Sequence, residues 1–75
     1  MLVGVPKEIK NHEYRVGLLP AGVRELIHHG HKVLVESDAG HAIGFDNASY
    51  ATIGAEIVAT PQEIFRRADL VVKVK

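Results

Sequence analysis

The chain has 75 residues, enough for one small domain, whose stability is marginal at this length. Nine basic and nine acidic side chains cancel, which argues against nucleic acid or a membrane surface as partner, because both favour a basic excess. The absence of cysteine excludes disulfides and thiolate metal sites, and it favours a cytoplasmic setting. The apolar run at the N-terminus reaches Pro6 too early for a signal peptide or a membrane span.

The first third of the chain predicts a strand, a loop and a helix. Residues 2–5 are apolar and predict a buried strand, residues 7–14 are polar and predict a loop, and residues 15–19 predict a brief extended segment. Pro20 suits the first position of a helix, because its missing N–H has no partner there. An apolar stripe of helical period follows, and Gly30 is suited to end the helix.

The middle of the chain predicts two more strands with a short helix between them. Residues 33–35 and 56–59 are apolar runs typical of buried strands. Asp46 is a good N-cap for a helix over residues 47–53, which Gly54 would close.

The strongest local signal is a helix start near residue 60. Thr60 as N-cap, Pro61 at the first position and Glu63 at the third form a capping box. We expect this helix to turn Ile64 and Phe65 inward.

Strands that alternate with helices predict an α/β fold, a parallel sheet with flanking helices, Rossmann-like in arrangement. The last strand begins near Asp69 and continues to the final residue with no turn after it. We therefore expect a truncated domain, a fragment of a longer protein that does not fold autonomously.

Basic side chains gather at two places where ligands collect in such sheets, beyond the carboxyl ends of strands. Lys7, Lys10 and Arg15 follow the first strand, and Lys73 and Lys75 end the last one. A guanidinium beside an ammonium suits a small keto acid or amino acid, because the fork grips a carboxylate and the ammonium polarises a carbonyl. Whether the two groups lie side by side depends on strand order, which the sequence leaves open.

A structural interpretation competes with this functional one. The loop lysines would be solvated, and Arg15 would pair with Glu8 or Glu13. Lys73 and Lys75 share one face of a strand and would mark where it leaves the sheet. On spacing alone, the structural interpretation is the stronger of the two.

Neither a metal nor a nucleotide site is predicted. His28, His29 and His31 cluster, but adjacent helical residues point 100° apart, and an exposed helix end explains them better. The glycine pair Gly40 and Gly44 lacks the third glycine of a dinucleotide loop.

The chain as a whole resembles the N-terminal signature of alanine dehydrogenases and pyridine nucleotide transhydrogenases. The resemblance covers essentially all 75 residues, and its matched positions are Gly4–Asn11, Glu13, Arg15, Val16, Pro20–Val23, Leu26, Gly30, His31, Ala39, Gly40, Gly44, Phe45, Tyr50, Gly54–Val58, Ala68–Leu70 and Lys73–Lys75. Departures occur at three positions beside Arg15, because His12, Gly17 and Leu19 stand where Asn, Ala, and Thr or Ser are usual.

The resemblance implies an enzyme that interconverts L-alanine and pyruvate plus ammonia with NAD. Residues 1–75 would be the N-terminal part of its substrate domain, with Arg15 on the substrate carboxylate and Lys75 on the carboxylate or carbonyl oxygen. The catalytic residues and the NAD-binding domain would lie outside this stretch, which alone would be inactive. The family also suggests a homo-oligomer, a hexamer. The alternatives are the corresponding segment of a proton-translocating NAD(P) transhydrogenase and a non-catalytic module that binds small carboxylates.

Overall fold

The structure is a computed structural model that describes residues 1–9 and 15–74. Strands and helices alternate along it, with one short 3₁₀ turn, as the sequence predicts. The elements are β1 (Leu2–Val5), α1 (Pro20–His28), β2 (Lys32–Glu36), the 3₁₀ helix η1 (His41–Ile43), α2 (Asn47–Ala51), β3 (Glu56–Val58), α3 (Pro61–Arg67) and β4 (Leu70–Val71).

The four strands form one sheet in the order β3-β2-β1-β4, and each neighbouring pair is parallel. Val3 of β1 aligns with Val33 of β2 on one side and with Leu70 of β4 on the other. The predicted α/β class with a parallel sheet is therefore confirmed.

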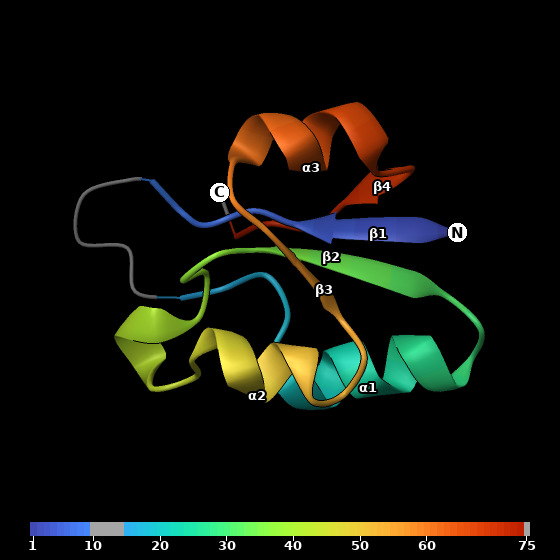
Figure 1. Cartoon of the computed structure of the whole chain (residues 1–75), viewed down its shortest axis with the longest axis horizontal. Coiled ribbons are helices and arrows are strands. Elements are labelled where there is room, and N and C mark those ends of the chain that lie inside the picture. The colour runs from blue at the N-terminus through green and yellow to red at the C-terminus, as the bar shows by residue number, and fades with distance from the viewer. Residues whose placement is uncertain (10–14, 75) are drawn as a thin grey trace.

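The helices cover both faces of the sheet (Figure 1). α1 and α2 lie on one face and α3 lies on the other. This division follows from the strand order, because β1, β2 and β3 step in one direction and the chain then returns to place β4 beyond β1. Parallel crossovers keep one hand, so a reversal of direction moves the connecting helix to the opposite face.

Two apolar clusters fill the space between the sheet and its helices. On the α1 side, Val3 and Val5 pack with Val33, Val35 and the fully buried Tyr50. On the α3 side, Leu34 packs against Ile64 and Val58. Neighbouring strand residues thus face opposite layers, which explains why the strands read as continuous apolar runs.

The predicted helix boundaries depend on caps that the structure bears out. The Asp46 side chain accepts a hydrogen bond from the Ser49 amide, and the Thr60 hydroxyl accepts one from the Glu63 amide. Gly30 has φ of 89°, the left-handed geometry in which glycine is favoured after a helix. Of the described residues, no helix is both long and apolar enough to cross a bilayer.

Four local predictions differ from the structure. Phe65 is 57% exposed instead of facing inward, because α3 already presents Ile64 to the sheet and the next residue points about 100° away. The extended segment predicted over residues 15–19 is interrupted by a bend at residues 17 and 18, where the chain turns toward α1. The last strand ends at Val71, well before residue 75, and α2 ends at Ala51.

Candidate functional site

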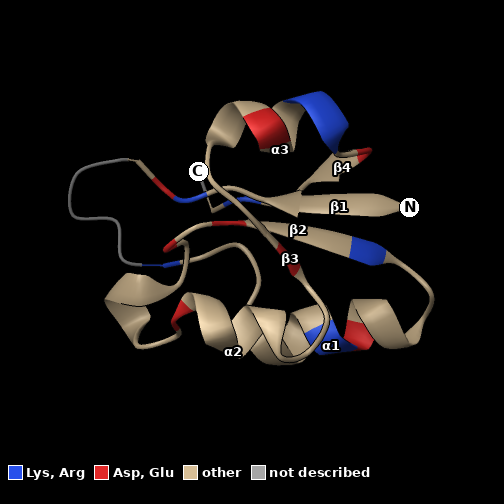
Figure 2. Ribbon diagram, in the orientation of Figure 1, with Lys and Arg blue, Asp and Glu red and all other residues tan. Residues whose placement is uncertain are grey.

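Several charged residues follow the ends of β1 and β2 along the chain, as the blue and red ribbon segments there show (Figure 2). Because β1 stands between β2 and β4, the loop that follows β1 neighbours the segments that follow both. The order in which strands join the sheet changes direction at β1, because β2 and β3 lie on one side of it and β4 lies on the other. In open parallel sheets, the crevice beyond the carboxyl ends at such a switch point is where ligands bind.

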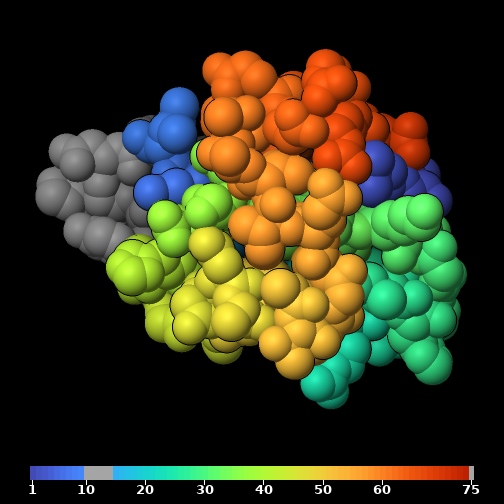
Figure 3. Space-filling view, viewed as in Figure 1, coloured from blue at the N-terminus to red at the C-terminus, as the bar shows by residue number. Residues whose placement is uncertain are grey.

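A small cleft of about 120 Å³ opens between the segments that follow β1 and β2. Both segments reach the surface side by side in the space-filling view (Figure 3). The cleft has cationic, anionic and imidazole side chains in its wall, and its lining residues are Lys7, Glu8, Arg15, Asp38, Ala39, His41 and Ala42.

The β1 side of the cleft is anchored by a buried carboxylate. Glu36, the last residue of β2, is 8% exposed, and its Oε1 accepts a hydrogen bond from the Lys7 amide at 2.9 Å. A bond from an amide to an ionised carboxylate is stronger than one between neutral groups. Glu36 therefore fixes the backbone from which the Lys7 side chain extends.

The β2 side of the cleft is a turn in an unusual backbone conformation. Asp38 has φ of 68°, a left-handed geometry that aspartate tolerates better than most side chains. Asn47 stabilises the turn, because its Oδ1 accepts from the Asp38 amide at 2.7 Å and its Nδ2 donates to the Ser37 hydroxyl at 3.0 Å.

Arg15, predicted to hold a carboxylate, is exposed and lies in the wall of this cleft. The residues after it are fastened to the core: Val16 is buried, and the Leu18 carbonyl accepts a hydrogen bond from the Tyr50 hydroxyl at 2.9 Å. Burial of the phenol raises the pKa of Tyr50. The backbone that carries Arg15 is thus held on its C-terminal side.

The segment after β4 meets the segments on either side of Arg15 at two points. Glu8 Oε2 accepts a hydrogen bond from the Val74 amide at 2.9 Å. Gly17 lies so close to Val72 that an added Cβ would be 2.4 Å from the Val72 carbonyl oxygen. Lys73 is exposed.

Two predicted positions, Lys75 and Lys10, lie outside the described residues. The structure therefore brings the Arg15 segment against the chain that leads to Lys75, without describing Lys75 itself.

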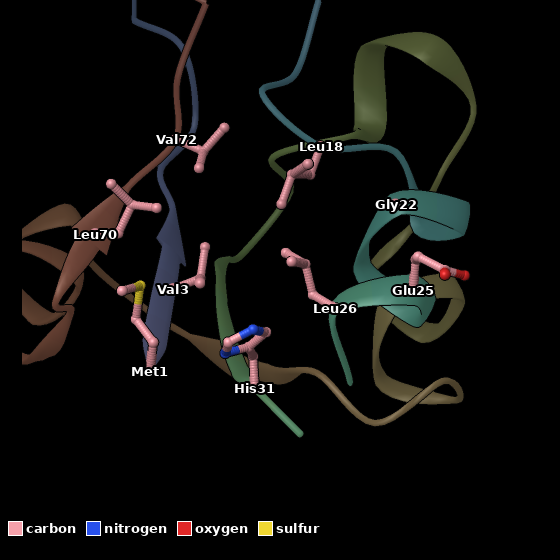
Figure 4. A pocket seen from close by; sticks show the side chains of 9 residues that line it. All are labelled: Met1, Val3, Leu18, Gly22, Glu25, Leu26, His31, Leu70 and Val72. Carbon is pink, nitrogen blue, oxygen red and sulfur yellow. The ribbon is translucent and has the colours of Figure 1, made fainter. Parts of the chain in front are cut away.

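The size and polarity of the cleft favour a small charged ligand. Pockets for drug-sized molecules have volumes of roughly 300–1,000 Å³, several times the volume here. A larger hollow of about 520 Å³ lies elsewhere, between α1, β1 and β4 (Figure 4). Its wall is almost wholly apolar, so it offers few partners for the carboxylate of a small ligand. The residues that line it are Met1, Val3, Leu18, Gly22, Glu25, Leu26, His31, Leu70 and Val72.

The described residues form neither a dinucleotide loop nor a recognisable metal site. Gly40 and Gly44 flank a three-residue 3₁₀ turn instead of opening a long helix. His29 bonds Glu25 on the same exposed helix, and within residues 1–9 and 15–74 no three metal-ligating side chains come together.

Several residues of the site were not singled out from the sequence. Glu36 and Asn47 hold the two walls of the cleft, and Asp38 and His41 contribute side chains to it. A charged residue directly at the carboxyl end of an apolar strand is the signal that points to Glu36. Asn47 has no comparable signal, because its role depends on how α2 folds back on the β2 turn.

A parallel sheet with helices on both faces, and a charged cleft beyond the carboxyl ends of its strands, defines an open-sheet α/β domain. The chain belongs to the family described as alanine dehydrogenase/PNT, N-terminal domain, whose family model matches residues 4–75.

Relatives and solved structures agree with this assignment. The alanine dehydrogenases of Bacillus subtilis (strain 168) and Methanococcus maripaludis are 55% and 49% identical to the whole chain. An L-alanine dehydrogenase structure superposes with a TM-score of 0.93 at 46% identity over 97% of the chain. A transhydrogenase structure from Sinorhizobium meliloti superposes with a TM-score of 0.89 at 27% identity, also over 97%. The chain spans 20% of the length of both relatives, and 20% and 21% of the two structures.

Proposed function

We propose that this chain forms the N-terminal part of the substrate domain of an NAD-dependent alanine dehydrogenase. In this proposal Arg15 holds the carboxylate of L-alanine or pyruvate, and Lys75 contacts the carboxylate or the carbonyl oxygen. Membership of the family supports the oxidoreductase class, and the names of the relatives favour alanine as the substrate.

The observation that carries the proposal is the strand order. With β1 between β2 and β4, the loop bearing Arg15 lies beside the segment that leads to Lys75, and the two are joined by the bond from the Val74 amide to Glu8. Residues 60 positions apart in the sequence thus belong to neighbouring segments. A different strand order would separate the two predicted substrate contacts by the width of the sheet.

The chemistry of the two side chains fits a keto acid. The planar guanidinium of arginine can donate two parallel hydrogen bonds to a carboxylate, which fixes orientation as well as affinity. An ammonium near the carbonyl oxygen stabilises the negative charge that develops there when the carbonyl carbon is reduced. The cleft volume of about 120 Å³ suits a molecule with few heavy atoms.

The proposed hydride carrier, NAD, does not fit the described residues. The cleft is far smaller than a cofactor pocket, and the Gly40 turn does not present a helix N-terminus to a pyrophosphate. We therefore assign NAD to a domain outside these 75 residues. By the same resemblance we propose a cytoplasmic homo-oligomer, a hexamer, that acts on a small molecule and not on nucleic acid or membranes.

A hybrid enzyme tests the proposal. The chain replaces the matching 75 residues of the Bacillus subtilis alanine dehydrogenase, and alanine-dependent reduction of NAD is followed. We expect the hybrid to be active. Arg15→Ala and Lys75→Ala should each lower kcat/KM for alanine by about 100-fold or more, the value of two hydrogen bonds to a charged group.

Arg15→Lys and Lys73→Ala serve as matched variants. Arg15→Lys keeps the charge but loses the fork, so its activity should be intermediate. Lys73→Ala removes a neighbouring exposed cation and should change little. Full alanine turnover in both Arg15→Ala and Lys75→Ala would overturn the site assignment.

A transhydrogenase remains the second candidate, because a protein of that name superposes well on this chain. Its identity of 27% is well below the 46% of the alanine dehydrogenase structure. A segment from a transhydrogenase would leave the hybrid without alanine activity, so the same assay separates the two candidates.

A further inference from the structure

We propose that Glu8 is a positioning residue of the substrate site: its carboxylate holds the backbone immediately before Lys75 in register with the loop that carries Arg15. The inference rests on the proposed function for its consequence in catalysis. Its structural part, a carboxylate that orders the segment after β4, stands independently.

The bond made by Glu8 begins where the sheet stops. β4 ends at Val71, and its last backbone contact with β1 is the bond from the Val72 amide to the Gly4 carbonyl at 2.9 Å. Beyond that point the ladder offers the amide of Val74 no strand partner. The Glu8 carboxylate accepts from this amide at 2.9 Å, in a partly buried position. The Glu8 side chain, from the loop that follows β1, thereby supplies the acceptor that a neighbouring strand would otherwise provide.

A second contact fixes the same two segments from the other side of Arg15. Gly17 packs directly on the backbone of Val72 and Lys73, since an added Cβ would lie 2.4 Å from the Val72 oxygen and 3.1 Å from the Lys73 Cα. Arg15 stands between Glu8 and Gly17 in the sequence. The residues on both sides of Arg15 therefore contact the segment that ends at Lys75.

The two contacts differ in what they contribute. The Gly17 contact is steric and sets how closely the segments approach. The Glu8 bond is directional, and an amide bound to an ionised carboxylate is a short, strong hydrogen bond. Val74 directly precedes Lys75 in the sequence, so the Glu8 bond holds the described backbone nearest to the proposed substrate contact. A displacement of about 1 Å in a substrate contact lowers catalysis by about 100-fold.

Glu36 offers an instructive comparison within the same loop. It binds the Lys7 amide in a similar way, but it belongs to β2 and ties the loop to the centre of the sheet. Glu8 ties the loop in the opposite direction, toward β4. Two carboxylates thus hold neighbouring parts of one loop, and Glu8 is the one of the two that reaches the segment after β4.

Variants of the hybrid enzyme test the proposal. Glu8→Ala removes the acceptor, whereas Glu8→Gln keeps an amide oxygen that can accept the same bond. We expect Glu8→Ala to lower kcat/KM for alanine by about 10- to 100-fold with KM for NAD unchanged, and Glu8→Gln to recover most of the loss. Glu25→Gln, an exposed glutamate on α1, is the control and should match the parent hybrid.

Hydrogen exchange of the peptide that contains Val74 gives a readout independent of activity. Glu8→Ala should accelerate exchange there, and Glu8→Gln should not. An inactive parent hybrid would contradict the proposed function, while the exchange of Val74 would still decide whether Glu8 orders this segment. Unchanged exchange in Glu8→Ala, or alanine turnover within twofold of an active parent, would overturn the role of Glu8. Equal losses in Glu8→Ala and Glu8→Gln would also overturn it, because the charge and not the accepted bond would then matter.

Discussion

Replacing Tyr50 by Phe removes one oxygen from the centre of the molecule and leaves the ring in place. Tyr50 is 1% exposed, and its hydroxyl donates to the Leu18 carbonyl at 2.9 Å. That bond joins α2 to the segment between Arg15 and α1. The variant therefore tests whether the backbone behind the predicted substrate contact depends on a single buried hydrogen bond.

The expected cost follows from the two groups involved. A buried hydrogen bond contributes about 1 kcal/mol net, and a carbonyl left without its partner raises the loss toward about 3 kcal/mol. Leu18 is only partly buried, so water can reach some of its surroundings and the lower value applies. In the larger hybrid enzyme, about 1 kcal/mol lowers Tm by about 2–4 °C.

The difference in stability between the parent protein and Tyr50→Phe should depend on pH, which provides a second test. Burial raises the pKa of Tyr50 above its ordinary value of 10.0, so the unfolded chain ionises first as pH rises. Stability that Tyr50 provides is complete below pH 10.0 and is lost as pH rises toward the higher folded pKa. Tyr50→Phe has no such group, and the gap between the two proteins should narrow above pH 10.

Thermal melts of the hybrid enzyme measure both effects, because the 75 residues alone are not expected to fold, with sulfate added equally to raise the stability of each variant. Tyr50→Leu, which also loses the aromatic ring, should melt lower than Tyr50→Phe. A melt of Tyr50→Phe within 1 °C of the parent at neutral pH would refute the importance of the Leu18 bond. A gap that stays constant above pH 10 would refute the buried phenol as its cause.

Two further predictions concern α3 and its neighbours. Thr60→Ala removes the acceptor for the Glu63 amide and should cost about 1 kcal/mol in thermal unfolding, whereas Thr60→Ser should retain most of it. Hydrogen bonds from Arg67 lower the pKa of Glu56 below 4.5, so stability present above pH 4.5 is lost as pH falls through the lowered value. In melts recorded from about pH 5 downward, Tm should fall less steeply with pH in Glu56→Gln than in the parent protein. An equally steep fall in both proteins would contradict the pairing of Glu56 with Arg67.

Local features of the fold could be predicted because their physics is contained in a few adjacent residues. Thr60 caps α3 through its own side chain, and Asp46 caps α2 in the same way. Gly30 ends α1 because the required backbone angle disfavours residues with a Cβ. Each of these interactions spans four residues or fewer, so the sequence pattern carries nearly all of the information.

Side-chain burial was harder to predict because it depends on the partner surface. Ile64 and Phe65 are both large and apolar, yet Ile64 is buried against the sheet and Phe65 is 57% exposed. Adjacent helical positions point in different directions, and the orientation of α3 decides which of the two is buried. The sequence indicates that α3 has an apolar side, but the sheet against which it packs selects the residue.

In the candidate site, too, side-chain chemistry could be predicted from the sequence, whereas the positions of distant segments could not. Side-chain chemistry pointed to five basic residues and the family resemblance singled out Arg15 and Lys75 among them, but neither showed whether their segments meet. The return of the chain to place β4 beside β1 answers that question for the backbone up to Val74. No local pattern encodes this return, because it brings together strands that lie far apart in the sequence. Glu8 shows how a local residue then exploits the global order: its carboxylate has an amide to bind only because β4, and not β2, lies on that side of β1.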